Sequence, residues 1–314
     1  MATSGSKDYS ITRAGIISAA LRKLGEYDQG ESPSGDETAA ANVALNVMVK
    51  EWTARGADIW LRDDITLFLQ PSQQVYSLGS SSSDHATVSH NETTLSDTGA
   101  AAATTLSVTS SSGMTASDYV GIKLNDNTIH WTTISSVASS TSIVIASGLA
   151  SAAASGKKVY AYTTKSVRPT KIEYAFRRDK NNLDNEVSII GEKEYKRQSN
   201  KGSSGPPVEI WYQPTLTTGS LYVWPVNGGA NWDKLILSAH FHPDDFDSAS
   251  DNPQFPQEWA NALIWGLAAE LSPEYGLPLN ERVYLHKVAD LKLEEALDFD
   301  VENASVEFTL NWER

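Results

Sequence analysis

The sequence predicts an α+β protein, with helices at both ends of the chain and a long β-rich middle, and three observations support this class. Near the N-terminus and again after residue 256, apolar residues recur every three or four positions, as on one face of a helix. Between these regions, short runs with alternating apolar residues are separated by turn-forming residues, which is the pattern of strands. The chain has 314 residues, of which 40% are hydrophobic, so it can bury the core of one large or two modest domains.

Two helices are expected near the N-terminus, over residues 10–25 and 34–55. Ser10 is the expected N-cap of the first, because a hydroxyl can accept a bond from a free N–H of the first turn. Ser34 and Glu37 have the spacing of a capping box at the start of the second. The apolar faces should pack as a helical hairpin. They comprise Ile11, Ala14, Ile17, Leu21 and Leu24 in the first helix, and Ala41, Ala44, Leu45, Met48 and Trp52 in the second.

The middle of the chain is predicted to be β-structure. Residues 65–69 and 75–78 alternate in polarity and flank the turn residues Pro71 and Ser72, which predicts a β-hairpin. A Ser-rich stretch with the composition of a flexible linker follows. Residues 85–164 are rich in Ser, Thr, Ala and Val and contain several short alternating runs, so we expect an inserted small β-barrel or sandwich there. Strand-like runs resume over residues 165–242.

The C-terminal third returns to the helical period, and helices are expected over residues 256–272 and 279–297. The last segment, 298–314, has an alternating pattern that can add a strand to a partner. Its apolar residues are Val306, Phe308, Leu310 and Trp312. We therefore expect residues 1–84 and 165–314 to form one domain that is interrupted by the β insert.

The charge balance excludes several kinds of partner. Lysine and arginine total 25 against 39 acidic residues, which gives a formal net charge of −14. Such a chain repels phosphate polymers and acidic membranes, so tight nonspecific DNA binding is not expected. The chain has no cysteine, which rules out disulfides and thiolate chemistry and indicates folding inside a cell. Neither a signal peptide nor an apolar run of about 18 residues is evident, so we expect no membrane span.

Candidate metal and catalytic residues are few. His240 and His242 lie one residue apart on an expected strand and would face the same side, with Asp244 directly after them. Because no third histidine lies nearby, we interpret them as strand residues that lead into an acidic turn. The carboxylate-rich loop from Asp244 to Asp251 lacks the spacing of an EF-hand. The common catalytic motifs are absent, so we predict no catalytic residue, no metal and no cofactor.

One region concentrates basic residues, but acids are interspersed among them. The basic residues are Arg177, Arg178, Lys180, Lys196, Arg197 and Lys201. This mixture fits a solvated sheet edge or a contact with a neighbouring subunit better than a nucleic-acid groove. Tryptophan is abundant, with nine residues, and some of these side chains are expected to anchor interfaces. Our candidates for a subunit interface are Trp52, Arg177, Arg178, Lys196 and Arg197.

Several segments occur in a characteristic order along the chain. The most distinctive are GSLYVWPV at 219–226, FPQEW at 255–259 and LAAELSPEYG at 267–276; the others are 20–25, 45–52, 68–79, 168–172 and 205–207. This ordered set resembles the head-to-tail adaptor proteins of short-tailed bacteriophages. The resemblance covers the chain except residues 85–164 and the extreme termini.

The resemblance implies a structural protein of the virion neck, made in the host cytoplasm, whose helical domain forms a ring. Such rings, usually of twelve copies, join the portal protein to the tail nozzle protein, extend the DNA channel and help to retain and deliver packaged DNA. An acidic lumen would let double-stranded DNA pass without tight binding. The tail with Val306, Phe308, Leu310 and Trp312 would dock on the portal.

Two alternatives remain open. The β insert could bind carbohydrate on the host surface, because aromatic residues such as Trp131 and Tyr160 lie on its expected strands. The chain could also be a cell-wall hydrolase that uses Glu258, Glu270 or the carboxylates between Asp244 and Asp251.

Overall fold

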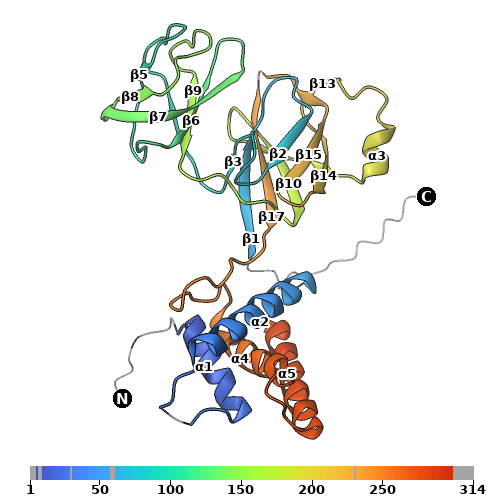
Figure 1. Ribbon diagram of the computed structural model, residues 1–314. Coiled ribbons are helices and arrows are strands. Elements are labelled where there is room, and N and C mark those ends of the chain that lie inside the picture. The colour runs from blue at the N-terminus through green and yellow to red at the C-terminus, as the bar shows by residue number, and fades with distance from the viewer. Residues whose placement is uncertain (1–4, 6–8, 29, 57–60, 230, 300–314) are drawn as a thin grey trace, which may run out of the picture. The chain divides into compact units, whose positions relative to one another are not determined.

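The computed structural model confirms an α+β fold and describes residues 5, 9–28, 30–56, 61–229 and 231–299. The chain divides into two compact units (Figure 1). The helical unit consists of Met1–Leu61 and His242–Arg314, and the β unit of Arg62–Phe241. The units thus divide at 61/62 and 241/242, whereas the sequence placed boundaries at 84/85 and 164/165. No helix in the described ranges is long and apolar enough to cross a membrane.

The helical unit joins both ends of the chain around one core. Its helices are α1 (Arg13–Leu24), α2 (Gly35–Ala54), α4 (Ala260–Leu271), which follows the 3-10 turn η2 (Gln257–Trp259), and α5 (Leu279–Phe299). Helix α4 is the central element, since α1, α2 and α5 all pack against it. The core includes Ile17, Leu21, Leu45, Met48, Trp259, Leu263, Leu267 and Leu285.

The starts of the first two helices test the capping predictions. The capping box of Ser34 and Glu37 is present, with the Glu37 amide donating to Ser34 Oγ at 3.3 Å and Glu37 Oε2 accepting from the Ser34 amide at 2.9 Å. The prediction of Ser10 as the first N-cap is wrong, because Thr12 Oγ1 accepts from the Gly15 amide at 3.2 Å. The amides of Arg13 and Ala14 donate to the carbonyls of Asp251 and Ala249, respectively. A loop from the other end of the chain therefore helps to fix where α1 begins.

Two sheets of the β unit pack face to face as a sandwich. The five-stranded sheet has the order β11-β10-β17-β1-β3 and comprises β1 (Arg62–Phe68), β3 (Ala86–Thr87), β10 (Lys171–Asp179), β11 (Asp184–Glu186) and β17 (Trp232–His240). The four-stranded sheet has the order β12-β14-β15-β2 and comprises β2 (Val75–Leu78), β12 (Ser188–Ile189), β14 (Glu209–Pro214) and β15 (Gly219–Trp224). A small parallel pair, β13 (Ser204–Gly205) with β16 (Val226–Asn227), lies beside them. Their shared core includes Leu67, Tyr76, Leu78, Ile210, Leu221 and Leu237.

The predicted hairpin of residues 65–69 and 75–78 is wrong. Strand β1 pairs with β17 and β3, whereas β2 pairs with β15 in the other sheet. The turn at Pro71 and Ser72, where Ser72 has a positive φ of 61°, carries the chain from one sheet to the other. Alternation of polarity marks each strand correctly but says nothing about which strand it pairs with.

The β insert forms a small six-stranded barrel with its own core. The strand order is β4-β9-β6-β7-β8-β5, with β4 (Asn91–Thr94), β5 (Thr105–Ser107), β6 (Tyr119–Lys123), β7 (Ile129–Ser139), β8 (Ser142–Ile145) and β9 (Lys158–Tyr162). The residues after β4 and β5 close the sheet, since the Ser96 amide donates to Ser107 O at 3.0 Å and the Thr109 amide to Thr94 O at 2.8 Å. The core includes Leu106, Val120, Ile122, Ile134, Ile143 and Val159.

Candidate functional site

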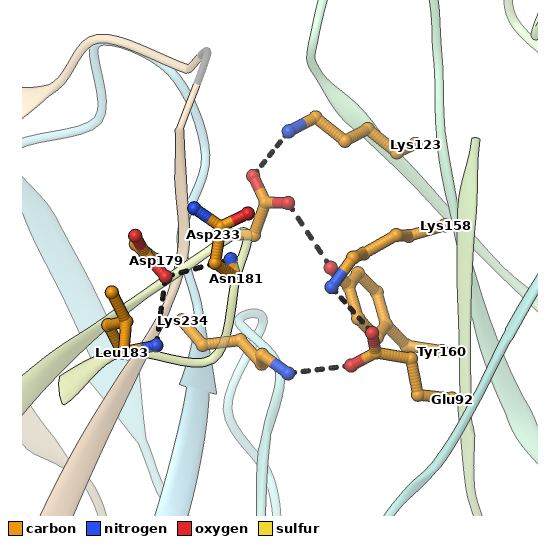
Figure 2. A network of polar contacts seen from close by, with 9 residues as sticks. All are labelled: Glu92, Lys123, Lys158, Tyr160, Asp179, Asn181, Leu183, Asp233 and Lys234. Atoms are coloured by element: carbon orange, nitrogen blue, oxygen red, sulfur yellow. Dashed lines mark hydrogen bonds and ion pairs between the residues drawn. The ribbon is translucent and has the colours of Figure 1, made fainter. Parts of the chain in front are cut away.

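A network of charged side chains joins the insert to the sandwich within the β unit (Figure 2). Asp233, at the start of β17, forms an ion pair with Lys123 of β6, with 2.5 Å between Lys123 Nζ and Asp233 Oδ1. Both side chains are less than a tenth exposed. The Tyr160 hydroxyl on β9 donates to the other carboxylate oxygen of Asp233 at 3.2 Å. Both oxygens of this buried carboxylate therefore have partners from the insert.

Glu92 of β4 forms the second part of this network. Its two oxygens pair with Lys158 Nζ at 2.5 Å and with Lys234 Nζ at 2.6 Å, so one carboxylate of the insert holds a lysine from each side of the junction. Burial raises the pKa of Glu92, but the bonds from both lysines outweigh it and hold the pKa below the usual value. Because unpaired buried charges are costly, this pairing favours one fixed position of the insert against the sandwich.

The two aromatic residues expected to bind sugar are occupied by the protein itself. Tyr160 is fully buried, and burial raises the pKa of its hydroxyl. The ring of His85 stacks on Trp131, with 3.8 Å between ring centroids and 5° between planes. Gly121 lies against the Trp131 ring so closely that a Cβ there would be 2.7 Å from it. Tyr160 therefore has no open face, and Trp131 is packed between His85 and Gly121.

A pocket of about 360 Å³ lies beside Trp131, where the insert meets the sandwich. His85 lines it, and burial together with the charge of Lys165 lowers the pKa of His85 to about 3, so the imidazole is neutral at physiological pH. Asp84, the carboxylate of the lining, accepts bonds from the Ser77 amide and from Gln73. The remaining lining side chains include Phe68, Gln70, Thr128 and His130. The chemistry of the lining suits a small neutral ligand that forms hydrogen bonds.

The expected basic region is separated into two parts. On β10, Arg177 donates to the carbonyl of Pro207, and Arg178 forms a bidentate pair with Asp184, with both distances 2.7 Å. Lys196 and Arg197 lie on α3 (Glu192–Arg197), a short helix that was not predicted, and not at a sheet edge; their contact with a neighbouring subunit stays a prediction. Lys196 pairs with Glu192 one turn earlier. The signal for α3 was present, because acids occupy its first turn and bases its last.

Trp52 is a core residue of the helical unit. Its side chain is 7% exposed and packs against Trp259, with 5.8 Å between ring centroids. Gly266 allows this packing, because a Cβ at that position would lie 2.8 Å from both Met48 and Trp52. Trp52 therefore belongs to the core of the isolated chain, beneath α4, and its place in a subunit interface stays a prediction.

The surface that the sequence analysis missed is the exposed side of two helices. On α2, four exposed apolar residues form what we call the α2 stripe, which comprises Ala39, Ala40, Val43 and Val47. On α5, the α5 stripe comprises Tyr284, Val288 and Leu291, of which Val288 is half-buried. A signal was available, because residues 38–49 contain no charged side chain although the segment is a helix with an exposed side.

His240 and His242 belong to different units of the chain. Strand β17 ends at His240, so the expectation that both lie on one strand is wrong. His240 is buried and its Nε2 lies 2.9 Å from Glu173 Oε2, which also pairs with Arg62 at 3.0 Å. The hydrogen bond with His240 and, to a smaller extent, the one with Arg62 hold the pKa of Glu173 below its usual value. Within the described ranges, no group of three or more His, Asp or Glu side chains is arranged to hold a metal ion.

The acidic loop of the helical unit lines a cavity of about 620 Å³. Asp251 accepts bonds from the amides of Asp247 and Ser248, and Asp244 accepts one from Gln254. Asp245 pairs with Lys50 of α2 at 2.9 Å. These carboxylates thus organise the loop that precedes α4.

The remaining candidates are placed as follows. Glu258 is exposed in η2, and Glu270 is exposed near the end of α4. The proposed docking residues Val306, Phe308, Leu310 and Trp312 lie outside the described residues. Comparison with protein-family models and with curated proteins finds no match to this chain.

Proposed function

We propose that the chain is a structural subunit of a phage virion, a head-to-tail adaptor that forms a ring between the portal and the tail nozzle. The observation that carries this proposal is the helical unit, which is built from both chain ends and leaves large apolar side chains exposed. Val43, Val47, Tyr284 and Leu291 are 64%, 62%, 62% and 50% exposed. Clustered exposed apolar surface of this kind is typical of protein–protein contact sites.

The charge of the chain supports a passive role toward DNA. A ring of twelve copies would multiply the net charge of −14 twelvefold, and an acidic lumen repels the phosphate backbone. Arg178 and Lys196 already pair with acids of the same chain. In this proposal the subunit shapes the channel for double-stranded DNA and has no catalytic role.

The proposed contact with the portal is made by the last residues of the chain. Deleting residues 300–314 removes the alternating segment with Phe308 and Trp312 and leaves all described helices and strands intact. The truncated chain should remain folded but no longer co-sediment with portal rings. Negative-stain images of the full chain with portal should show an added ring. Unchanged co-sedimentation of the truncated chain, or images without an added ring, would contradict the proposal.

A second candidate function is carbohydrate binding, and the pocket beside Trp131, with its hydrogen-bonding lining, favours it. In this version the sugar enters the pocket and does not stack on the strands of the insert. A glycan array probed with the full chain should show binding of neutral saccharides, and Gln73→Ala, which changes a lining residue of the pocket, should weaken it. Gln213→Ala, on β14 and not among the lining residues, serves as the control. Blank arrays with the unmutated chain would remove this candidate.

A further inference from the structure

We propose that neighbouring copies join by packing the α2 stripe of one copy against the α5 stripe of the next. This inference rests on the proposed function, because it specifies the subunit contact from which the ring would be built. The partner is therefore a second copy of this chain, and the contact joins two different surfaces.

Helix α2 lacks the polar face that a surface helix normally has. Residues 38–49 read TAAANVALNVMV and contain no charge. Leu45 and Met48 point into the core, whereas Val43 and Val47 are 64% and 62% exposed on the opposite side. A helix that is apolar on both sides is normally covered on both. The outer side of α2 thus has the composition of a buried surface.

Helix α5 carries its own exposed apolar flank. Tyr284, Val288 and Leu291 occur at the spacing i, i+4 and i+7, so turns of 100° per residue place them on one side. Tyr284 is 62% and Leu291 50% exposed. The core-facing residues Leu285 and Ala289 lie on another side of the same helix. The side chains of this flank are larger than those of the α2 stripe, which consists of two alanines and two valines.

The two stripes do not face each other within one chain. A groove of about 180 Å³ runs between α2, α4 and α5. Its lining residues include Met48, Glu51, Trp52 and Arg55 from α2, and His286, Ala289, Asp290 and Leu293 from α5. No residue of either stripe lines it. At 100° per residue, the α5 stripe lies on the flank roughly opposite the groove, and the α2 stripe is turned away from it by roughly 100°.

The placement of the two stripes on different sides of the subunit determines the symmetry of the proposed assembly. A contact between unlike surfaces on different sides of one subunit is heterologous and repeats from copy to copy, so it closes into a ring when the rotation allows. A contact of the α2 stripe with itself would instead give a two-fold dimer and end there.

Charge and size select another copy as the occupant. Identical chains with a net charge of −14 repel one another, and approach is least unfavourable where charges are missing. The α2 stripe meets that condition, since residues 38–49 are uncharged. Ala39 and Ala40 leave room between the ridges of α2 for larger side chains, and the rings of Tyr284 and the branches of Leu291 are of that size.

The size of the contact determines how it should be measured. The uncharged run spans about 18 Å of helix at 1.5 Å per residue. One helix–helix contact of this length buries much less than the roughly 800 Å² per partner typical of stable complexes. Association of isolated pairs is therefore weak, and covalent trapping is better suited than sizing.

The absence of cysteine makes site-specific cross-linking direct. We would introduce Val43→Cys in one sample and Leu291→Cys in another, mix them at high concentration and oxidise. A disulfide-linked dimer should form in the mixture at least severalfold more than in either sample alone. The double variant Val43→Cys/Leu291→Cys should give a ladder of higher multimers, because each copy then offers both sides of the contact.

A matched control is Glu294→Cys, which is also exposed on α5 but lies outside the stripe. Mixed with Val43→Cys, it should cross-link no more than background. Dimers of Val43→Cys alone that are as abundant as those of the mixture would overturn the inference in favour of a two-fold contact. Failure of the Val43→Cys and Leu291→Cys mixture to cross-link, with both variants folded by circular dichroism, would show that another surface covers the stripes.

The same samples separate this inference from the proposed function. Cross-linked multimers that are open filaments in negative stain would support the α2–α5 contact and contradict the ring. Rings that assemble on portal while the double variant gives no ladder would support the adaptor and overturn the contact.

Discussion

The junction of the insert with the sandwich and the outer side of the helical unit differ in how completely the chain satisfies them. At the junction, Asp233 and Glu92 each use both carboxylate oxygens, and their partners come from within the β unit. On the helical unit, Val43 and Val47 have apolar neighbours along the helix and are 64% and 62% exposed among the described residues. The charges of the junction are thus paired within one chain, whereas the apolar side chains on the outer side of α2 are left exposed to solvent.

Under the proposed assembly, exposed apolar residues mark the subunit contact better than charged residues do. The charged side chains at the junction pair with one another within the β unit, whereas the side chains of Val43 and Val47 are mostly exposed. The contrast predicts different losses of unfolding free energy. Removing one partner of a buried ion pair leaves the other charge unpaired, whereas removing an exposed methyl group leaves no group unpaired.

The largest effect is expected at the buried ion pair. Asp233→Ala leaves the Lys123 ammonium buried without its counter-ion, which should destabilise the β unit by about 3–5 kcal/mol. Urea denaturation followed by fluorescence measures the change. Lys292→Ala, at an exposed pair with Glu295, is the control and should cost less than about 0.5 kcal/mol. A small loss at Asp233 would mean that the junction is hydrated and does not hold the insert firmly.

The core of the helical unit should respond almost as strongly. Leu45 is fully buried on the inner side of α2, so Leu45→Ala should cost about 2–5 kcal/mol of unfolding free energy. Thermal unfolding followed by the circular dichroism of the helices would measure this loss of stability. An effect below about 1 kcal/mol would contradict the assignment of this side of α2 to the core.

The effect of acid at the junction is expected to be smaller for each pH unit. The folded pKa of His85 is about 3 against an ordinary value of 6.5, so its stabilising contribution is complete above pH 6.5 and decreases as the pH falls toward 3. One such group changes stability by at most about 1.4 kcal/mol per pH unit in that window. His85→Phe keeps an aromatic ring against Trp131 and should flatten the slope between pH 6.5 and 4. An unchanged slope would assign the acid sensitivity to other groups, such as His90.

The smallest effect on stability is expected on the outer side of α2. Val43→Ser should change the unfolding free energy by less than about 0.5 kcal/mol, since the side chain is 64% exposed. Assembly on portal rings, measured by co-sedimentation, should nevertheless decrease. Val137→Ser, on the insert with 36% exposure, is a matched control that should leave assembly unchanged. Equal assembly by the wild-type chain and Val43→Ser would remove the distinction between the two regions.

Local chemistry made parts of the fold predictable. The class and the four long helices follow from apolar periodicity, and the capping box of Ser34 and Glu37 is a short-range pattern. Residues whose partners are distant in sequence were not predictable in this way. Thr12 replaces Ser10 as the cap where the loop around Asp251 meets α1, and β2 pairs with β15 although it follows β1 directly.

The candidate site shows the same limit. The Lys123–Asp233 pair spans 110 positions, so neither residue stands out in the sequence. Tyr160 was singled out for its type, but burial decides its role. The α2 stripe could have been found, because twelve uncharged residues in a helix with one obvious core face leave the other face unexplained.

The helical unit is assembled from chain segments on either side of the β unit, and this has a consequence for biosynthesis. During translation, α1 and α2 leave the ribosome before α4 exists, and the bonds from the start of α1 to the carbonyls of Ala249 and Asp251 cannot form until that loop is made. At about 5–20 residues per second, the intervening β unit takes on the order of ten seconds or more to synthesise. The β unit can therefore fold first, while both sides of α2 are still exposed to solvent. We expect chaperones to bind such an exposed apolar segment during synthesis.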